Sequence, residues 1–88
     1  MVRVRVKGID SETNEPIPFA RVEFWRPGDK RPFKVSSTDE EGVAEVDVPE
    51  GKYTVLFKSQ LHKPVRHEVE ITEPLELTIK SFKIVVGG

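Results

Sequence analysis

The stretch Ser36–Phe57 constrains the fold of this chain more than any other, because apolar and polar residues alternate along it and two glycine-containing turns interrupt it. A repeat of two residues places every second side chain on the same face of an extended strand. Such alternation indicates strands with one face in a core and the other in water. The apolar positions of the repeat are Ala44, Val46, Val48, Tyr53, Val55 and Phe57.

The two turns carry conformational signals of their own. Asp39-Glu40-Glu41-Gly42 ends in a glycine, where a hairpin loop requires a residue in the left-handed conformation. In Pro49-Glu50-Gly51 the proline presets φ and the glycine supplies a positive φ at little cost. The sequence therefore predicts tight turns at both places, with a hairpin loop at the first.

The same alternation recurs along the rest of the chain. The 7 prolines are spread so that no segment fits the helical repeat better than the strand repeat. About seven short strands separated by turns predict an all-β fold without substantial helix. We expect a single antiparallel β-sandwich, transthyretin-like or immunoglobulin-like, formed by one domain over residues 1–88. The further expected strands are residues 1–7, 19–25, 33–37 and 65–72, and a last strand that starts at residue 75.

The inward-facing positions of these strands define an expected core. The apolar parity of the last strand changes near Lys80-Ser81, which predicts a bulge or a break at that point. The expected core residues are Val4, Val6, Ala20, Val22, Phe24, Val35, Ala44, Val46, Val48, Tyr53, Val55, Phe57, Val69, Ile71, Leu77 and Ile79.

Composition excludes several classes of protein. The 14 basic and 15 acidic residues give a net charge of −1, whereas a nucleic-acid-binding domain normally carries a basic excess. The absence of cysteine excludes disulfides, thiolate metal sites and cysteine nucleophiles. No apolar run approaches the roughly 18 residues of a membrane helix, and the N-terminus lacks the apolar region of a signal peptide. We expect neither nucleic acid nor a membrane as a partner; a secreted form would be a mature or excised piece.

The surface composition is also informative. The chain has a single methionine, and lysine, glutamate and arginine occupy nearly every outward strand position. Local propensity, alternation and turn chemistry agree almost everywhere along the chain. This profile is typical of a thermostable protein from a thermophile. It is equally typical of a computationally designed or redesigned sandwich.

Several motifs together resemble those of the carboxypeptidase regulatory-like domains. These are transthyretin-like β-sandwiches, related in style to the B-type repeats of bacterial collagen-binding adhesins. The resemblance covers about residues 4–79, and its motifs are specific for fold rather than for function. The matching segments are Pro16-Ile17-Pro18, Ala20-Arg21-Val22, Ser37-Thr38-Asp39 with Gly42, and Pro49–Val55.

The chain departs from this family at two places: Phe19 stands where the family usually has glycine, and Leu61-His62 where it often has Gly-Tyr. The resemblance implies an accessory module without chemistry of its own, covalently linked to a parent domain. It implies an extracellular or cell-surface location if the protein is natural. We therefore expect a non-enzymatic accessory or scaffold module that needs no cofactor.

Two groups of residues are candidate metal ligands. The segment Asp10–Asn14 places oxygen donors at alternate positions, as a calcium loop does. However, Glu15 stands where that loop needs glycine, and Arg21 where it needs a bidentate glutamate. The segment therefore favours a polar connection whose short side chains bond their own backbone.

The only histidines, His62 and His67, lie five residues apart across a junction of loop and strand, which does not fix a metal geometry. His67 shares parity with Val69 and Ile71, so we expect it to cap the core at a strand end. No nucleophile elbow or paired-carboxylate motif is present. The sequence predicts no metal site and no enzyme activity.

Three aromatic residues are candidate ligand contacts. Trp25 and Phe19 share the outward parity of the second expected strand, and Phe33 begins the third. One interpretation is that these rings close the ends of a small core. The other is that exposed rings stack on a sugar or anchor a peptide, which would make the chain a glycan- or peptide-binding module using Trp25 and Phe33.

Two further features have ordinary explanations. Arg3, Arg5 and Lys7 form a basic face that we expect to pair across strands with acidic side chains. The terminal Gly87-Gly88 resembles the tail of ubiquitin-like modifiers, but those folds need a helix that this sequence does not encode. The expected acidic partners of the basic face are Glu45 and Asp47, or Glu68 and Glu70.

Overall fold

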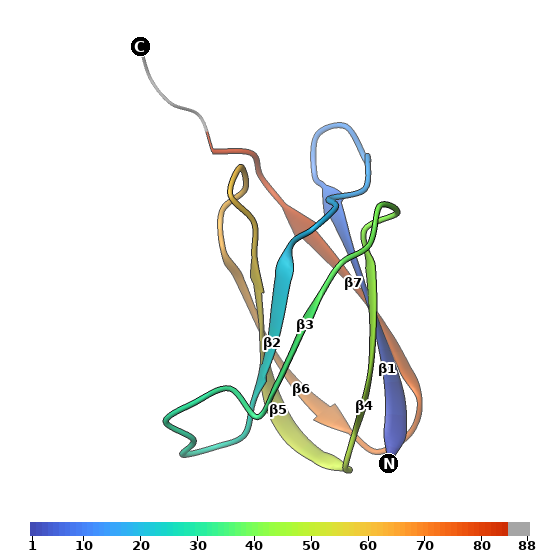
Figure 1. The fold of residues 1–88 in the computed structure, drawn as a ribbon, viewed down its shortest axis with the longest axis vertical. Helices are drawn as coiled ribbons and strands as arrows, with labels where there is room; N and C mark the ends of the chain where they lie inside the picture. The colour runs from blue at the N-terminus through green and yellow to red at the C-terminus, as the bar shows by residue number, and fades with distance from the viewer. Residues whose placement is uncertain (85–88) are drawn as a thin grey trace.

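The computed structural model describes residues 1–84, which form an all-β sandwich as predicted (Figure 1). Gly87-Gly88 lies outside the described residues. The described part contains no helix of the length and apolar character needed to cross a membrane. Its strands are β1 (Val2–Asp10), β2 (Arg21–Trp25), β3 (Lys34–Ser37), β4 (Val43–Val48), β5 (Gly51–Lys58), β6 (Val65–Ile71) and β7 (Leu75–Ser81).

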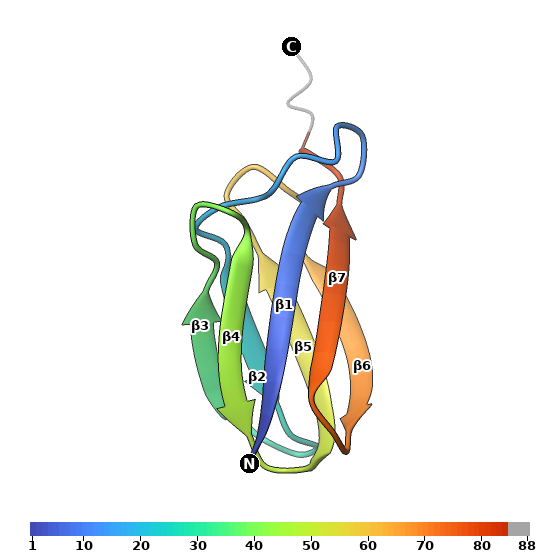
Figure 2. The ribbon, with the colours of Figure 1, turned by 90° about the vertical axis from the view of Figure 1, so that its right-hand side faces the viewer.

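The strands form two layers (Figure 2). One sheet has three strands in the order β4-β1-β7, and the other has four in the order β3-β2-β5-β6. All neighbouring strands are antiparallel except β1 and β7, which run parallel with Val4 opposite Leu75 and Asp10 opposite Ser81. A parallel pair needs a long connection. Here the whole four-stranded sheet lies in the chain between the two strands.

Both glycine turns cross from one sheet to the other, so the predicted hairpin at Asp39–Gly42 is wrong. β3 pairs with β2, whereas β4 pairs with β1. The conformational part of the prediction is confirmed, since φ is +77° at Gly42 and +154° at Gly51. Alternation and turn chemistry determine where a strand reverses but do not determine which strand it pairs with.

The core consists mainly of the residues expected from alternation, but Val35 is a correction. Val35 lies opposite Glu23 on the outer face of the four-stranded sheet and is 40% exposed. Ile17, in the irregular β1–β2 connection, is buried although no alternation marks it. Val69 and Leu77 are only partly buried against the core.

The ends of two strands also differ from a simple alternating pattern. β2 begins at Arg21, and Phe19 precedes it with φ +56° and a side chain that is 73% exposed. β7 ends at Ser81, which agrees with the predicted break in parity. Beyond that point Phe82 and Ile84 are exposed, because the chain has left the sheet.

Candidate functional site

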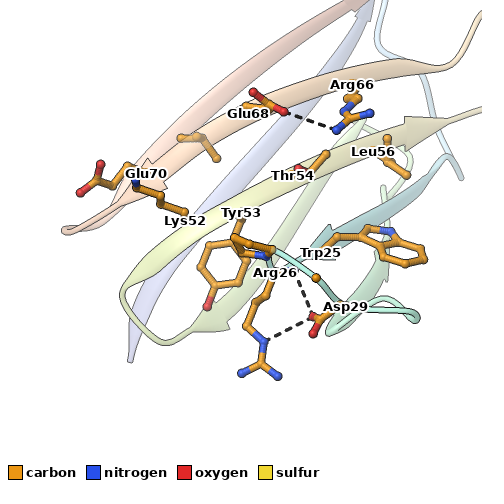
Figure 3. Close-up of a pocket in the computed structure, with 13 residues that line it drawn as sticks. Trp25, Arg26, Asp29, Lys52, Tyr53, Thr54, Leu56, Arg66, Glu68 and Glu70 are labelled. Atoms are coloured by element: carbon orange, nitrogen blue, oxygen red, sulfur yellow. Dashed lines mark hydrogen bonds and ion pairs between the residues drawn. The ribbon is translucent and has the colours of Figure 1, made fainter.

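The structure separates the three aromatic candidates. Trp25 is partly buried at the end of β2 and lines a hollow of about 720 Å³ over the outer face of the four-stranded sheet (Figure 3). Phe33 packs against the core, and the centroid of its ring lies 6.2 Å from the centroid of the Tyr53 ring. The Arg26 guanidinium lies 4.0 Å from the centroid of the Phe33 ring. Phe19 lies on the connection before β2. The rings therefore do not form one surface.

The register of β2, β5 and β6 builds the hollow, which we call the outer groove. Outward positions on these three strands stand in rows across the sheet. Trp25, Thr54 and Glu68 make one row, and Glu23, Leu56 and Arg66 make the next. The β2–β3 loop, with Arg26 and Asp29, borders the end of the groove. The groove is defined by Trp25, Arg26, Asp29, Lys52, Thr54, Leu56, Arg66, Glu68 and Glu70.

Glu23 lies at the centre of this face and is only 4% exposed, and its carboxylate holds the neighbouring side chains in place. Its carboxylate accepts a hydrogen bond from the Trp25 indole Nε1 at 2.9 Å and another from Arg21 Nε, and Lys58 Nζ lies 3.5 Å away. Burial raises the pKa of Glu23, but the bonds from Trp25 and Arg21 and the attraction of Lys58 outweigh it, so the pKa lies below its usual value. Glu23 is therefore an anion that fixes the Trp25 ring.

The charged residues at the rim of the outer groove are paired with each other (Figure 3). Arg66 lies 3.3 Å from Glu68, and Arg26 Nε lies 3.4 Å from Asp29 Oδ2. Asp29 Oδ2 also accepts the backbone N–H of Arg26 at 3.1 Å, which closes the turn at the start of the β2–β3 loop. The rim therefore presents carboxylates and guanidinium groups side by side.

A second polar cluster lies at the end of the sandwich where β1 and β7 end. Asp10 Oδ1 accepts the backbone N–H groups of Glu12 and Thr13 at 2.9 and 3.1 Å, so the polar connection bonds its own backbone as expected. Asp10 Oδ2 lies 2.9 Å from His62 Nε2. The hydrogen bond from His62 and those from Glu12 and Thr13 lower the pKa of Asp10 to about 2.

His62 and Ser59 extend this cluster. His62 is 7% exposed, and its Nδ1 lies 3.3 Å from Ser59 Oγ. Neither hollow described for residues 1–84 is lined by Ser59, His62 or Asp10. The contact between His62 and Asp10 ties the β5–β6 loop to the end of β1.

The prediction that His67 caps the core is wrong, because its side chain is exposed. β6 is an edge strand, and the narrower three-stranded sheet leaves part of its inner side uncovered. Within residues 1–84, no group of three or more histidine, aspartate or glutamate side chains is arranged to hold a metal ion. Within the basic face of β1, the expected pairing with β4 is confirmed for Arg3, which lies 3.2 Å from Asp47 and 3.8 Å from Glu45.

Sequence reasoning missed two interactions that organise these clusters, the bond between Glu23 and Trp25 and the pair formed by Asp10 and His62. The signal for Glu23 was present, since Arg21, Glu23 and Trp25 occupy alternate positions and so share one face of β2. The Asp10–His62 pair carried no local signal, because its members lie 52 residues apart.

No protein-family model and no curated protein matches the chain, so the carboxypeptidase regulatory-like assignment stays a prediction. Solved structures do share its fold. The TIE protein of Bacillus anthracis superposes with a TM-score of 0.79 at 20% identity, over 93% of this chain and 17% of that one. A variant of the major pilin subunit of Bacillus cereus superposes at 0.78 and 16% identity, over 94% of this chain and 30% of that one.

A third structural match is an enzyme. The 5-hydroxyisourate hydrolase of Klebsiella pneumoniae superposes with a TM-score of 0.67 at 14% identity, over 97% of this chain and all (100%) of that one. At these identities the likeness shows the fold alone. The chain is therefore a β-sandwich of the kind found in pilin subunits and in a transthyretin-like hydrolase, and it spans under a third of the first two proteins.

Proposed function

We propose that this chain is a non-enzymatic accessory or scaffold module, covalently linked to other domains of a cell-surface or extracellular protein. The observation that carries the proposal is the fraction of each chain that the structural superposition covers. The fold takes up 94% of this chain but only 30% of the Bacillus cereus pilin, where it is one part of a longer chain.

The arrangement of the first and last strands supports this role. β1 begins at one end of the sandwich and β7 ends at the other, and the two strands lie side by side in the same sheet (Figures 1 and 2). A pull along the long axis therefore slides β1 against β7. The β1–β7 ladder runs from Val4 opposite Leu75 to Asp10 opposite Ser81. Under such a pull all of its hydrogen bonds bear the force together rather than one at a time.

A tandem array tests whether the chain is a module of this kind. Three copies joined end to end should each unfold with the free energy of the single copy, because neither sheet depends on a neighbour for its core. The array should also lengthen in proportion to the number of copies in small-angle X-ray scattering. Loss of cooperative unfolding in the array, or collapse into a compact particle, would contradict the proposal.

The alternative, a glycan- or peptide-binding module using Trp25 and Phe33 together, has less support because different partners hold the two rings: Tyr53 and Arg26 contact Phe33, whereas Glu23 bonds Trp25. Phe33 packs toward the core and Trp25 faces outward. The outer groove supports a binding role for Trp25 by itself.

A further inference from the structure

We propose that the outer groove binds a neutral oligosaccharide, with one pyranose ring stacked on Trp25 and its hydroxyl groups bonded by Asp29, Arg66 and Glu68. This site goes beyond the scaffold role, since a module can carry a ligand and still be a spacer. The experiment that tests it is independent of any array or pulling measurement.

The first argument is the way in which Trp25 is held. Its indole N–H is already satisfied by Glu23 at 2.9 Å, so the ring offers its apolar face rather than a donor. Glu23 is in turn held by Arg21 and Lys58, so the ring is fixed before a ligand arrives. A fixed aromatic face loses little conformational entropy on binding. The apolar C–H face of a pyranose is a suitable partner for such a ring.

The second argument is the mixed character of the groove. Leu56 and Thr54 form the floor beside Trp25, and charged groups stand along the rim (Figure 3). The volume of about 720 Å³ falls within the range of small-ligand sites, roughly 300–1,000 Å³. A saccharide matches this surface because it has apolar ring faces and hydroxyl groups around its edge.

The third argument is charge. Three cations line the groove together with three anions, so its net charge is zero. Arg66 is paired with Glu68 and Arg26 with Asp29, and Lys52 stands opposite Glu70 in the register of β5 and β6. An anionic ligand would have to displace the carboxylates, and a cationic ligand the guanidinium groups. Neutral hydroxyl groups can donate to carboxylates and accept from guanidinium groups without breaking this balance.

The fourth argument concerns peptides. An extended peptide usually gains its affinity by adding a strand to a free sheet edge. The groove lies on a sheet face, where β5 is flanked by β2 on one side and β6 on the other. The main-chain groups of β5 are therefore engaged in the ladders. A ligand in the groove has to be recognised through side chains, as a saccharide is.

The test uses the fluorescence of Trp25, the single tryptophan of the chain, so any change in the signal reports on the groove. Cellohexaose, xylohexaose and mannohexaose are titrated against the intact chain, with a sulfated hexasaccharide and a proline-rich peptide as competitors of other chemistry. We expect a saturable spectral shift with at least one neutral hexasaccharide. We expect a weaker response or none with the sulfated sugar and the peptide.

Variants identify the contact, with binding followed by calorimetry and folding checked by a dispersed amide spectrum. Trp25→Ala should weaken binding at least tenfold, which corresponds to about 1.4 kcal/mol. Arg66→Ala truncates a side chain that is 67% exposed, and it should weaken binding several-fold. Phe19→Ala removes an exposed aromatic ring outside the groove and is the matched control, so it should leave the affinity unchanged.

Three results would overturn the proposal. The first is no saturable shift with any neutral hexasaccharide at about 10 mM, where even a Kd of about 1 mM would be visible. The second is binding of the sulfated sugar or the peptide alone. The third is binding of a neutral hexasaccharide that neither Trp25→Ala nor Arg66→Ala weakens.

Discussion

His62 Nε2 lies 2.9 Å from Asp10 Oδ2, and this contact joins the end of β1 to the β5–β6 loop. Both side chains are 9% exposed, so the pair is shielded from water. The segment after β7 pairs with the same loop, as Ile84 donates its backbone N–H to Leu61 O at 2.7 Å. The Asp10–His62 pair therefore holds together the end of the sandwich from which the chain continues beyond β7.

The first prediction concerns acid stability. The pKa of Asp10 is lowered from 3.8 to about 2, so its contribution to stability is fully present above pH 3.8 and is lost as the pH falls toward about 2. Urea unfolding at several pH values across this window should show that loss in the native chain. Asp10→Asn should be less stable at neutral pH and should lack this part of the slope.

Glu12→Gln is the matched control, because it removes a carboxylate from the same loop and leaves the Asp10–His62 pair intact. Its stability should follow the pH dependence of the native chain across the window. An Asp10→Asn variant with the native slope would show that the carboxylate does not stabilise this end of the sandwich.

The second prediction concerns Phe19, which has φ +56° although its side chain is 73% exposed. The left-handed conformation costs a residue with a side chain about 1 kcal/mol, whereas glycine adopts it readily. Phe19→Gly should therefore raise the free energy of unfolding by about 1 kcal/mol, measured by urea denaturation. Phe19→Ala keeps the strained backbone and removes the same ring, so a gain of equal size in that variant would show that the ring, not the backbone, is responsible.

The third prediction concerns Gly8 on β1. A Cβ atom at this position would overlap the ring of Phe57, which is fully buried. Gly8→Ala should lower the free energy of unfolding by about 1–3 kcal/mol, as overpacking of a core does. Gly28→Ala is a useful comparison, because φ is +80° there but no atom lies within 4 Å of the added carbon. If Gly8→Ala left the free energy of unfolding unchanged, close packing at Gly8 would be ruled out.

The fourth prediction concerns the buried carboxylate of the outer groove. Glu23→Gln keeps the size of the side chain but removes the charge that Arg21 and Lys58 face. We expect a loss of about 1–2 kcal/mol of stability, the usual cost of weakening a charged hydrogen bond at a buried position. Trp25 fluorescence should change as well. Glu45→Gln, at an exposed position of β4, should change stability by less than about 0.5 kcal/mol.

Much of the fold could be predicted because strand faces follow a local rule. Val46 and Val48 are buried where alternation places them. Val35 was misplaced because β3 is a short edge strand, and its face is decided by pairing with Glu23 of β2 rather than by its own sequence. The hairpin expected at Gly42 was wrong because the turn does not determine strand pairing. A tight turn can join two strands of one sheet or two strands of different sheets.

At Phe19 the family resemblance supplies information that alternation does not. The family resemblance marks this position as one where glycine is usual, and the positive φ gives the physical reason. The candidate sites were harder to predict because they depend on distant residues. Trp25 was recognised by its type, but Leu56 and Arg66 join it only through the register of β2, β5 and β6. The Asp10–His62 pair likewise exists only once the sandwich has formed.

The proposal that the chain is a module linked to other domains, with β1 and β7 loaded in shear between them, is tested most directly by single-molecule pulling. The chain has no cysteine, so introduced cysteines serve as unique handles. Handles at Arg3→Cys and Lys83→Cys load β1 and β7 in shear. Handles at Glu12→Cys and Lys83→Cys pull apart the neighbouring ends of the same two strands.

At equal loading rate, we expect the Arg3→Cys and Lys83→Cys handles to require a several-fold larger unfolding force than the Glu12→Cys and Lys83→Cys handles. Shear loads the whole β1–β7 ladder at once, whereas the second geometry breaks its bonds in sequence. An equal or smaller force along the long axis would contradict the account.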